Sequence, residues 1–119
     1  METKTLGNFG EEQAARFLRR RGYRIVERNF RCRQGEIDLI AEGRGFLVFV
    51  EVKLRKDERF AEAREFVTVA KQRRILAAAQ LWLTQHETDR QPRFDVVEVY
   101  APQGEKGPVR IEHIEDAFM

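Results

Sequence analysis

Hydrophobic positions along the chain recur with two different periods, and each period indicates one type of element. Over residues 6–21, small or apolar residues return every three or four positions, and Glu and Arg fill the positions between them. This is the period of an amphipathic helix, which we expect to begin at or slightly before Asn8 and to end at Gly22. The apolar residues of 69–85 lie on one face in the same way and predict a second helix.

Five other stretches favour strands. They are residues 23–30, 36–42, 46–53, 94–100 and 109–114. Gly43, Arg44 and Gly45 separate the second from the third, which is typical of a β-hairpin. Residues 31–35 and 102–108 read as turns, and the charged stretch 54–66 is open between loop and helix. The predicted order is αβββαββ: an α/β fold of one domain, residues 1–119, with helices packed on a mixed central sheet.

Composition and charge exclude several classes of protein. A hydrophobic content of 42% is too high for a disordered tail, and no apolar run is longer than that of 46–50, which is far too short for a membrane span of about 20 residues. Cys32 is the only cysteine, so no internal disulfide can form, and we expect a cytoplasmic protein. Cys32, His86 and His113 have no partner at a metal-binding spacing and are interpreted as ordinary small, surface or capping residues.

The predicted hairpin places three charged residues in a position to form a site. Glu51 and Lys53 project from the same face of their strand because side chains alternate. If the turn has two residues, Asp38 lies directly opposite Glu51, whereas a three-residue loop would shift the pairing by one position. Two opposed carboxylates need a positive charge between them, and oxygen ligands without His or Cys suit Mg²⁺ or Mn²⁺. Beside such a metal, Lys53 suits phosphodiester hydrolysis; alone, a Glu-x-Lys pair is more often an exposed ion pair.

Residues 35–41 (GEIDLIA) and 48–55 (VFVEVKLR) closely resemble the core of the YraN-like bacterial family, within the PD-(D/E)XK, restriction-endonuclease-like superfamily. Further matching positions lie in both predicted helices and in the fourth strand. The resemblance implies a fold similar to that of archaeal Holliday junction resolvases, with Asp38 and Glu51 as metal ligands and Lys53 as the catalytic lysine. It also implies Glu11 as a further ligand or a contact to a metal-bound water, and it gives Gln72 and Arg55 weaker roles near the substrate.

A net charge of +2 hides a strongly basic segment. Residues 16–33 contain eight arginines and one glutamate. Such a cluster can follow a phosphate backbone, although a solvated surface explains it about as well. The predicted nucleic-acid contacts are Arg16, Arg20, Arg24, Arg31, Arg55, Lys71 and Gln72.

Three functions are compatible with these features. The first is a Mg²⁺- or Mn²⁺-dependent nuclease acting on DNA, on branched or repair intermediates, and as a homodimer if it cuts both strands of a junction. The second is a non-catalytic nucleic-acid-binding module with a nuclease-like fold. The third is a scaffold protein that binds neither metal nor nucleic acid.

Overall fold

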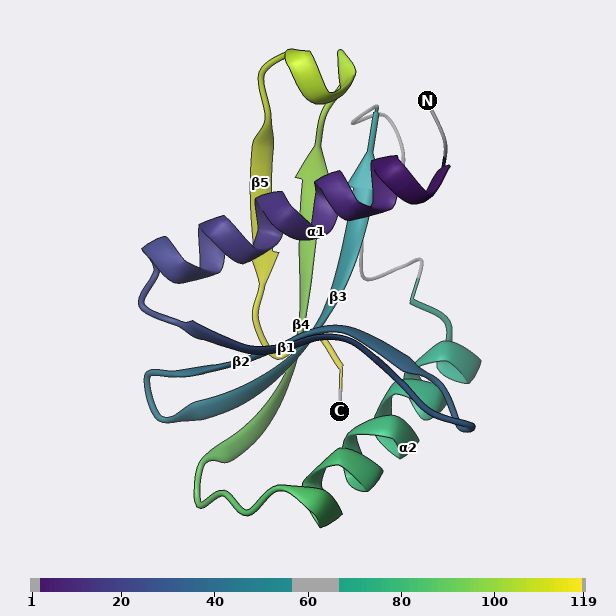
Figure 1. The fold of residues 1–119 in the computed structure, drawn as a ribbon, viewed down its shortest axis with the longest axis vertical. Helices are drawn as coiled ribbons and strands as arrows, with labels where there is room; N and C mark the ends of the chain where they lie inside the picture. Colours follow the sequence, from purple (N-terminus) through teal and green to yellow (C-terminus); the bar gives the residue numbers. More distant parts are fainter. Residues whose placement is uncertain (1–2, 57–66, 119) are drawn as a thin grey trace.

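The computed structural model describes residues 3–56 and 67–118 and confirms the predicted order of elements (Figure 1). The elements are α1 (Thr3–Arg20), β1 (Arg24–Arg31), β2 (Glu36–Gly43), β3 (Phe46–Arg55), α2 (Val69–Gln85), β4 (Gln91–Tyr100), the short 3₁₀ helix η2 (Gly104–Lys106) and β5 (Arg110–Ile114). Most of the stretch 54–66, open between loop and helix, lies outside the described residues. No helix in the described ranges is long and apolar enough to cross a membrane.

The five strands form one mixed sheet in the order β1-β2-β3-β4-β5. Neighbouring strands are antiparallel except β3 and β4, which are parallel and are joined through α2. A parallel pair needs such a crossover connection, and a helix is the usual one. Figure 1 shows the sheet strongly twisted, with β1 and β2 turned across the direction of β4 and β5.

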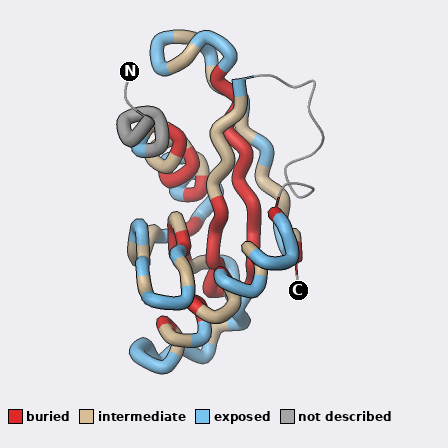
Figure 2. Tube along the Cα trace, turned by 90° about the vertical axis from the view of Figure 1, so that its right-hand side faces the viewer, coloured by how far each residue is buried: buried red, intermediate tan, exposed pale blue. Residues whose placement is uncertain are grey.

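The two helices cover different parts of the sheet and create two cores. On the α1 side, Ala14, Ala15 and Leu18 pack with Leu39, Ala41, Val48, Val50, Val97 and Val99. On the α2 side, Ile75, Ala78, Ala79 and Trp82 pack with Ile40, Leu47, Phe49, Phe94 and Val96. Figure 2 shows the central strands buried along most of their length. Because β3 alternates between these cores, Glu51 and Lys53 lie on the α2 side with Leu47 and Phe49.

The ends of both helices follow local chemistry. The first helix begins at Thr3, earlier than the position near Asn8 that we predicted, and it ends as predicted. Gly22 has a φ of 97°, and the Tyr23 N–H donates to the Leu18 carbonyl at 3.0 Å, which is a Schellman ending. The second helix has its predicted bounds, and the Thr68 hydroxyl caps it by accepting from the Lys71 N–H at 3.1 Å.

The turn between β1 and β2 packs closely against α2 at Gly35. A Cβ at this position would lie 2.7 Å from the backbone carbonyl oxygen of Arg74, closer than real Cβ contacts. We expect Gly35→Ala to lower the free energy of unfolding by about 1–3 kcal/mol through this overpacking, measured by urea denaturation. Gly10→Ala is the matched control, because a Cβ there would meet Leu54 at an ordinary 3.5 Å and alanine favours the helix. Equal effects of the two changes would contradict the expectation.

Candidate active site

The hairpin of β2 and β3 has the two-residue turn on which the predicted site depends. Gly43 pairs with Phe46 and the register continues unchanged to Leu39 and Val50, which confirms the predicted pairing and excludes the shifted one. Arg44 and Gly45 both have positive φ, 56° and 87°, as a type I′ turn requires.

Asp38 and Glu51 are the residues that directly follow the last of these pairs, Leu39 with Val50. The Val52 N–H donates to Asp38 Oδ2 at 2.8 Å, which holds the Asp38 carboxyl against β3. The two carboxyl groups also share a hydrogen bond. Glu51 is only 5% exposed, and Asp38 is half-buried. The structure therefore brings the two predicted ligands into direct contact in a mostly dry environment.

Burial of the pair changes the acidity of Asp38. Burial raises the pKa of Asp38 to about 7, and the negative charges of Glu51 and, more weakly, Glu11 act in the same direction. Near neutral pH and without a metal, Asp38 therefore keeps a proton in a large fraction of molecules. A cation between the two carboxylates would favour the ionised form of Asp38 and so lower this pKa.

Two lysines approach the same carboxylate from different elements. Lys71 of α2 places Nζ 2.5 Å from Glu51 Oε2, and Lys53 of β3 places Nζ 3.5 Å from the same atom. Burial is the main cause of the lowered pKa of Lys53; the charge of Glu51 opposes it, and the charge of Lys71 adds to it. For Lys71, burial lowers the pKa, but the hydrogen bond to Glu51 and the negative charges of Glu51 and Asp38 together outweigh burial, and the pKa is raised. Lys71 is thus the tightly paired cation, and Lys53 is the lysine nearer to losing its proton.

Glu11 lies near this group but is directed elsewhere. The Asn29 side chain, on β1, donates to Glu11 Oε1 at 2.9 Å. In the described part of the chain, no three His, Cys, Asp or Glu side chains gather as a set that could hold a metal ion. The structure therefore joins Asp38 and Glu51 but leaves Glu11 beside them, and the role of Glu11 as a further ligand stays a prediction.

Several arginines of residues 16–33 are paired with acidic residues, some in the same helix and some in other elements. Arg16 and Arg28 both contact Glu12, at 3.0 and 2.8 Å. Arg24 Nε donates to Glu42 at 2.9 Å, and Arg31 lies 3.3 Å from Glu36. Arg20 is exposed at the end of α1. These exposed pairs are weak and can open toward phosphates, so DNA contacts of Arg16, Arg20, Arg24 and Arg31 stay predictions.

Two of the other predicted contacts have evident structural roles. Arg55 Nε lies 3.0 Å from Glu98 Oε2, and Glu98 is only 1% exposed. Gln72 donates to the Val67 carbonyl at 2.8 Å, which ties the chain before α2 to the helix. Arg55 therefore balances a buried charge and Gln72 stabilises the entry to α2, whereas their contacts with DNA remain predictions.

A buried polar network on the α1 side of the sheet was missed by our reasoning from sequence. Asp95 is fully buried and accepts from Arg93 Nε at 2.9 Å and from Arg93 Nη2 at 2.8 Å. His113 Nε2 lies 2.6 Å from Asp95, and its side chain is 1% exposed. Our interpretation of His113 as a surface or capping histidine is therefore wrong, because β5 carries it into the core. The sequence feature that could have indicated this network is the pair Arg93 and Asp95, which lie on one face of a strand whose following residues on that face are apolar.

The raised pKa of Asp38 predicts a pH dependence of stability in metal-free protein. Asp38 titrates near its ordinary value of 3.8 when unfolded and near 7 when folded, so its contribution to stability is lost as pH rises from about 4 to about 7. Relative to Asp38→Asn, the wild type should lose on the order of 2–4 kcal/mol of unfolding free energy over this range. Urea denaturation in EDTA at several pH values measures the difference, and a wild type that gains stability relative to the variant would contradict it.

The sequence matches a known protein family over most of its length. The profile of "Uncharacterised protein family UPF0102" matches residues 10–99. This chain belongs to the UPF0102 family. It is similar to a UPF0102 protein of Symbiobacterium thermophilum, with 49% identity over 117 residues that cover 98% of both chains. A UPF0102 protein of Caldanaerobacter subterraneus is 42% identical, covering 97% of this chain and 95% of its own.

The part of the chain that matches the UPF0102 family includes the whole candidate site. It spans every residue of the carboxylate and lysine group, from Glu11 in α1 to Lys71 in α2. It also includes Arg93 and Asp95, whereas His113 lies beyond it. The family assignment thus covers the whole candidate site without naming an activity for it.

Proposed function

We propose that this protein is a metal-dependent nuclease that hydrolyses phosphodiester bonds in DNA, with branched or repair intermediates as substrates. The observation that carries the proposal is the contact between Asp38 and Glu51, with the Lys53 amino group 3.5 Å from Glu51. The resemblance to the PD-(D/E)XK superfamily supports the same reading. The homodimer expected for an enzyme that cuts both strands of a junction is part of this proposal.

The carboxylate pair fits a hard divalent cation. Mg²⁺ is commonly held by one or two carboxylates together with water and substrate phosphate oxygens, so Asp38 and Glu51 suffice as protein ligands. Burial raises the pKa of Asp38 most and the charge of Glu51 raises it further, and a divalent cation beside the pair would favour the ionised carboxylate against both effects. Mg²⁺ or Mn²⁺ would supply Lewis-acid polarisation of the phosphate and a more acidic water.

The lysine and the two carboxylates have separate tasks in this proposal. Lys53 is placed beside the carboxylates and has a lowered pKa, so it can orient an attacking water or accept its proton, and when protonated it stabilises negative charge on the phosphate. The Val52 N–H holds Asp38 in place. Lys71 neutralises Glu51 when no metal cation is bound. When a metal cation balances Glu51, Lys71 is free to contact a phosphate.

A cleavage screen tests the proposal. Branched, flapped, single-stranded and duplex DNA, together with an RNA strand, are incubated with Mg²⁺ or Mn²⁺ and with EDTA. We expect metal-dependent cleavage of at least one DNA substrate by wild type, and none by Glu51→Gln, which keeps the shape of the side chain and removes its charge. Cleavage that persists in EDTA, or that is equal in the two proteins, would contradict the mechanism. Calorimetry with Mn²⁺ measures metal binding separately.

A non-catalytic nucleic-acid-binding module is the second candidate. The Lys71 contact favours it, because the buried Glu51 charge is already balanced without a metal. This function predicts salt-sensitive DNA binding that weakens when Arg16, Arg20 and Arg24 are neutralised, with every substrate unchanged in length after long incubation with metal.

A further inference from the structure

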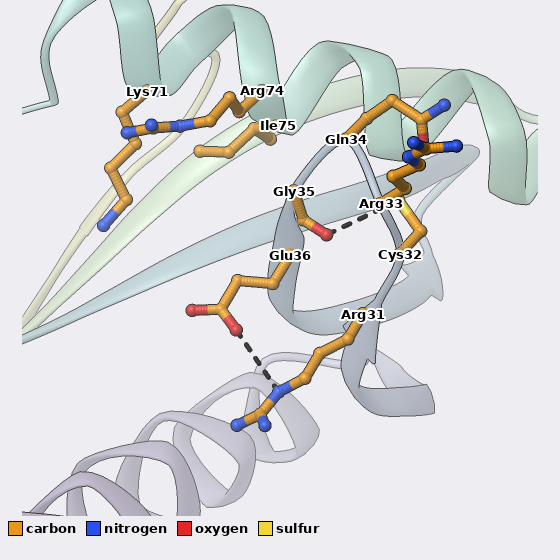
Figure 3. Close-up of a pocket in the computed structure, with 9 residues that line it drawn as sticks. All are labelled: Arg31, Cys32, Arg33, Gln34, Gly35, Glu36, Lys71, Arg74 and Ile75. Carbon is orange, nitrogen blue, oxygen red and sulfur yellow. Dashed lines mark hydrogen bonds and ion pairs between the residues drawn. The ribbon is translucent and has the colours of Figure 1, made fainter.

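A basic pocket adjoins the candidate active site. It has a volume of about 470 Å³ and lies between the turn joining β1 to β2, residues 31–36, and Lys71, Arg74 and Ile75 of α2 (Figure 3). The close packing of Gly35 against the Arg74 carbonyl sets the spacing between its two walls. Lys71 belongs to both places, because it lines the pocket and contacts Glu51.

The charges around the pocket favour an anion. Four cationic side chains line it against one carboxylate: Arg31, Arg33, Lys71 and Arg74 against Glu36. Glu36 pairs with Arg31 at 3.3 Å, but both side chains are more than half exposed, so the pair is weak. Figure 3 shows Lys71 and Arg74 extending from the same side of α2, with the Glu36 carboxylate on the strand side of the same space. A phosphate that enters the pocket would therefore contact Lys71 and Arg74 together and could also replace Glu36 as the ion-pair partner of Arg31.

The size and lining of the pocket suit a ligand larger than one phosphate group on the surface of a DNA duplex. Its volume lies in the range of about 300–1,000 Å³ that is usual for small-ligand pockets. Part of its lining is apolar, since Ile75 is 3% exposed and the Cys32 thiol turns inward to donate to the Gly35 carbonyl at 3.4 Å. A cavity with cationic and apolar walls suits a base together with its phosphate, and a base inside a duplex cannot enter such a cavity without leaving the stack.

We propose that this pocket binds an unpaired nucleotide of the DNA strand, adjoining the phosphate that the active site cleaves. The inference rests on the proposed function, which it deepens by naming the substrate class. Lys71 connects the two places, so a nucleotide held in the pocket positions the next phosphate near Asp38 and Glu51. Substrates with unpaired nucleotides are therefore preferred over fully paired duplex, which must first lose stacking and pairing.

Fluorescence anisotropy in EDTA tests the pocket independently of metal and cleavage. Single-stranded DNA, duplex DNA and duplex with an unpaired overhang, matched in length, are titrated with wild type and with Arg74→Gln. We expect the strands with unpaired nucleotides to bind at least about 10-fold tighter than duplex, and Arg74→Gln to weaken that binding about 5–10-fold with a smaller salt slope. Arg44→Asn is the control. It removes the same charge at the opposite end of the hairpin and keeps a residue suited to positive φ, and its effect should stay below about 2-fold.

Two results would overturn the inference. One is duplex DNA that binds wild type as tightly as single strands. The other is an equal loss of affinity in Arg74→Gln and Arg44→Asn. A third comparison uses strands with and without a terminal phosphate. If the affinity depends on that phosphate, the pocket binds the end of a strand and not an unpaired nucleotide, which would also overturn the inference. If the binding pattern holds but no substrate is cut, the pocket stands and the nuclease proposal fails, so the two failures are distinguishable.

Discussion

Lys53→Ala is expected to lower the rate of metal-dependent DNA cleavage by about 10²–10³-fold, the usual loss when one group that stabilises transition-state charge is removed. Lys53 lies on β3 beside Glu51 and has a lowered pKa, whereas Lys71 approaches the same carboxylate from α2 and has a raised pKa, which makes it the poorer proton acceptor. Because Asp38 and Glu51 are untouched, binding of Mn²⁺ should persist. Single-turnover cleavage and calorimetry measure the two properties separately.

The matched control for this change is Lys56→Ala, which removes an exposed lysine just beyond β3. It should leave the rate of cleavage within a few-fold of wild type. Lys53→Arg separates the two roles of the lysine: recovery of cleavage would indicate charge stabilisation, and its absence would indicate proton transfer, since arginine stays protonated. A Lys53→Ala protein that cleaves as well as wild type would show that the mechanism is wrong.

Asp95→Ala is expected to destabilise the protein by about 3–5 kcal/mol, the range for removing one partner of a buried ion pair. Asp95 is fully buried and accepts hydrogen bonds from Arg93, His113 and the Asp116 backbone N–H. Its removal leaves the Arg93 guanidinium, itself 8% exposed, without its carboxylate in the α1-side core. Urea denaturation at neutral pH should show a clear fall in the midpoint.

The pH dependence of this effect follows from the acidity of Asp95. Burial alone would raise the pKa of Asp95, but the hydrogen bonds from His113 and Arg93 outweigh it and the pKa is lowered. The stabilisation is therefore present above the unfolded-state value near 3.8 and is lost as pH falls through the lower folded-state value. Glu112→Ala is the control, because the Arg110–Glu112 pair is exposed and worth under about 1 kcal/mol. Equal effects of Asp95→Ala and Glu112→Ala at neutral pH would contradict this account.

Most of the fold could be predicted from local pattern. The bounds of α2 were correct because apolar residues repeat over its whole length and Thr68 caps it. The start of α1 was predicted too late, because the residues before Leu6 carry no apolar repeat that marks a beginning. The contact of Asp38 with Glu51 was predicted on condition of a two-residue turn, which the sequence left open against a three-residue loop and the structure shows.

The remaining features depend on elements that are distant in the sequence. Neither Lys71 nor His113 has a local pattern that indicates its partner. Lys71 meets Glu51 only because the crossover from β3 to β4 packs α2 on that side of the sheet, and His113 meets Asp95 only because β5 pairs with β4. The pocket likewise requires the β1–β2 turn to pack against α2.

The sequence by itself determined the order of elements and limited the hairpin to two registers, because each depends on residues joined by one turn or one repeat; the structure shows the register that brings the two carboxylates together. Only the tertiary structure decided which cation balances Glu51, which residues neutralise the arginines of 16–33, and where the basic pocket lies. Those contacts arise from the packing of α1 and α2 on a twisted sheet, and that packing depends on the whole set of apolar surfaces rather than on any local spacing.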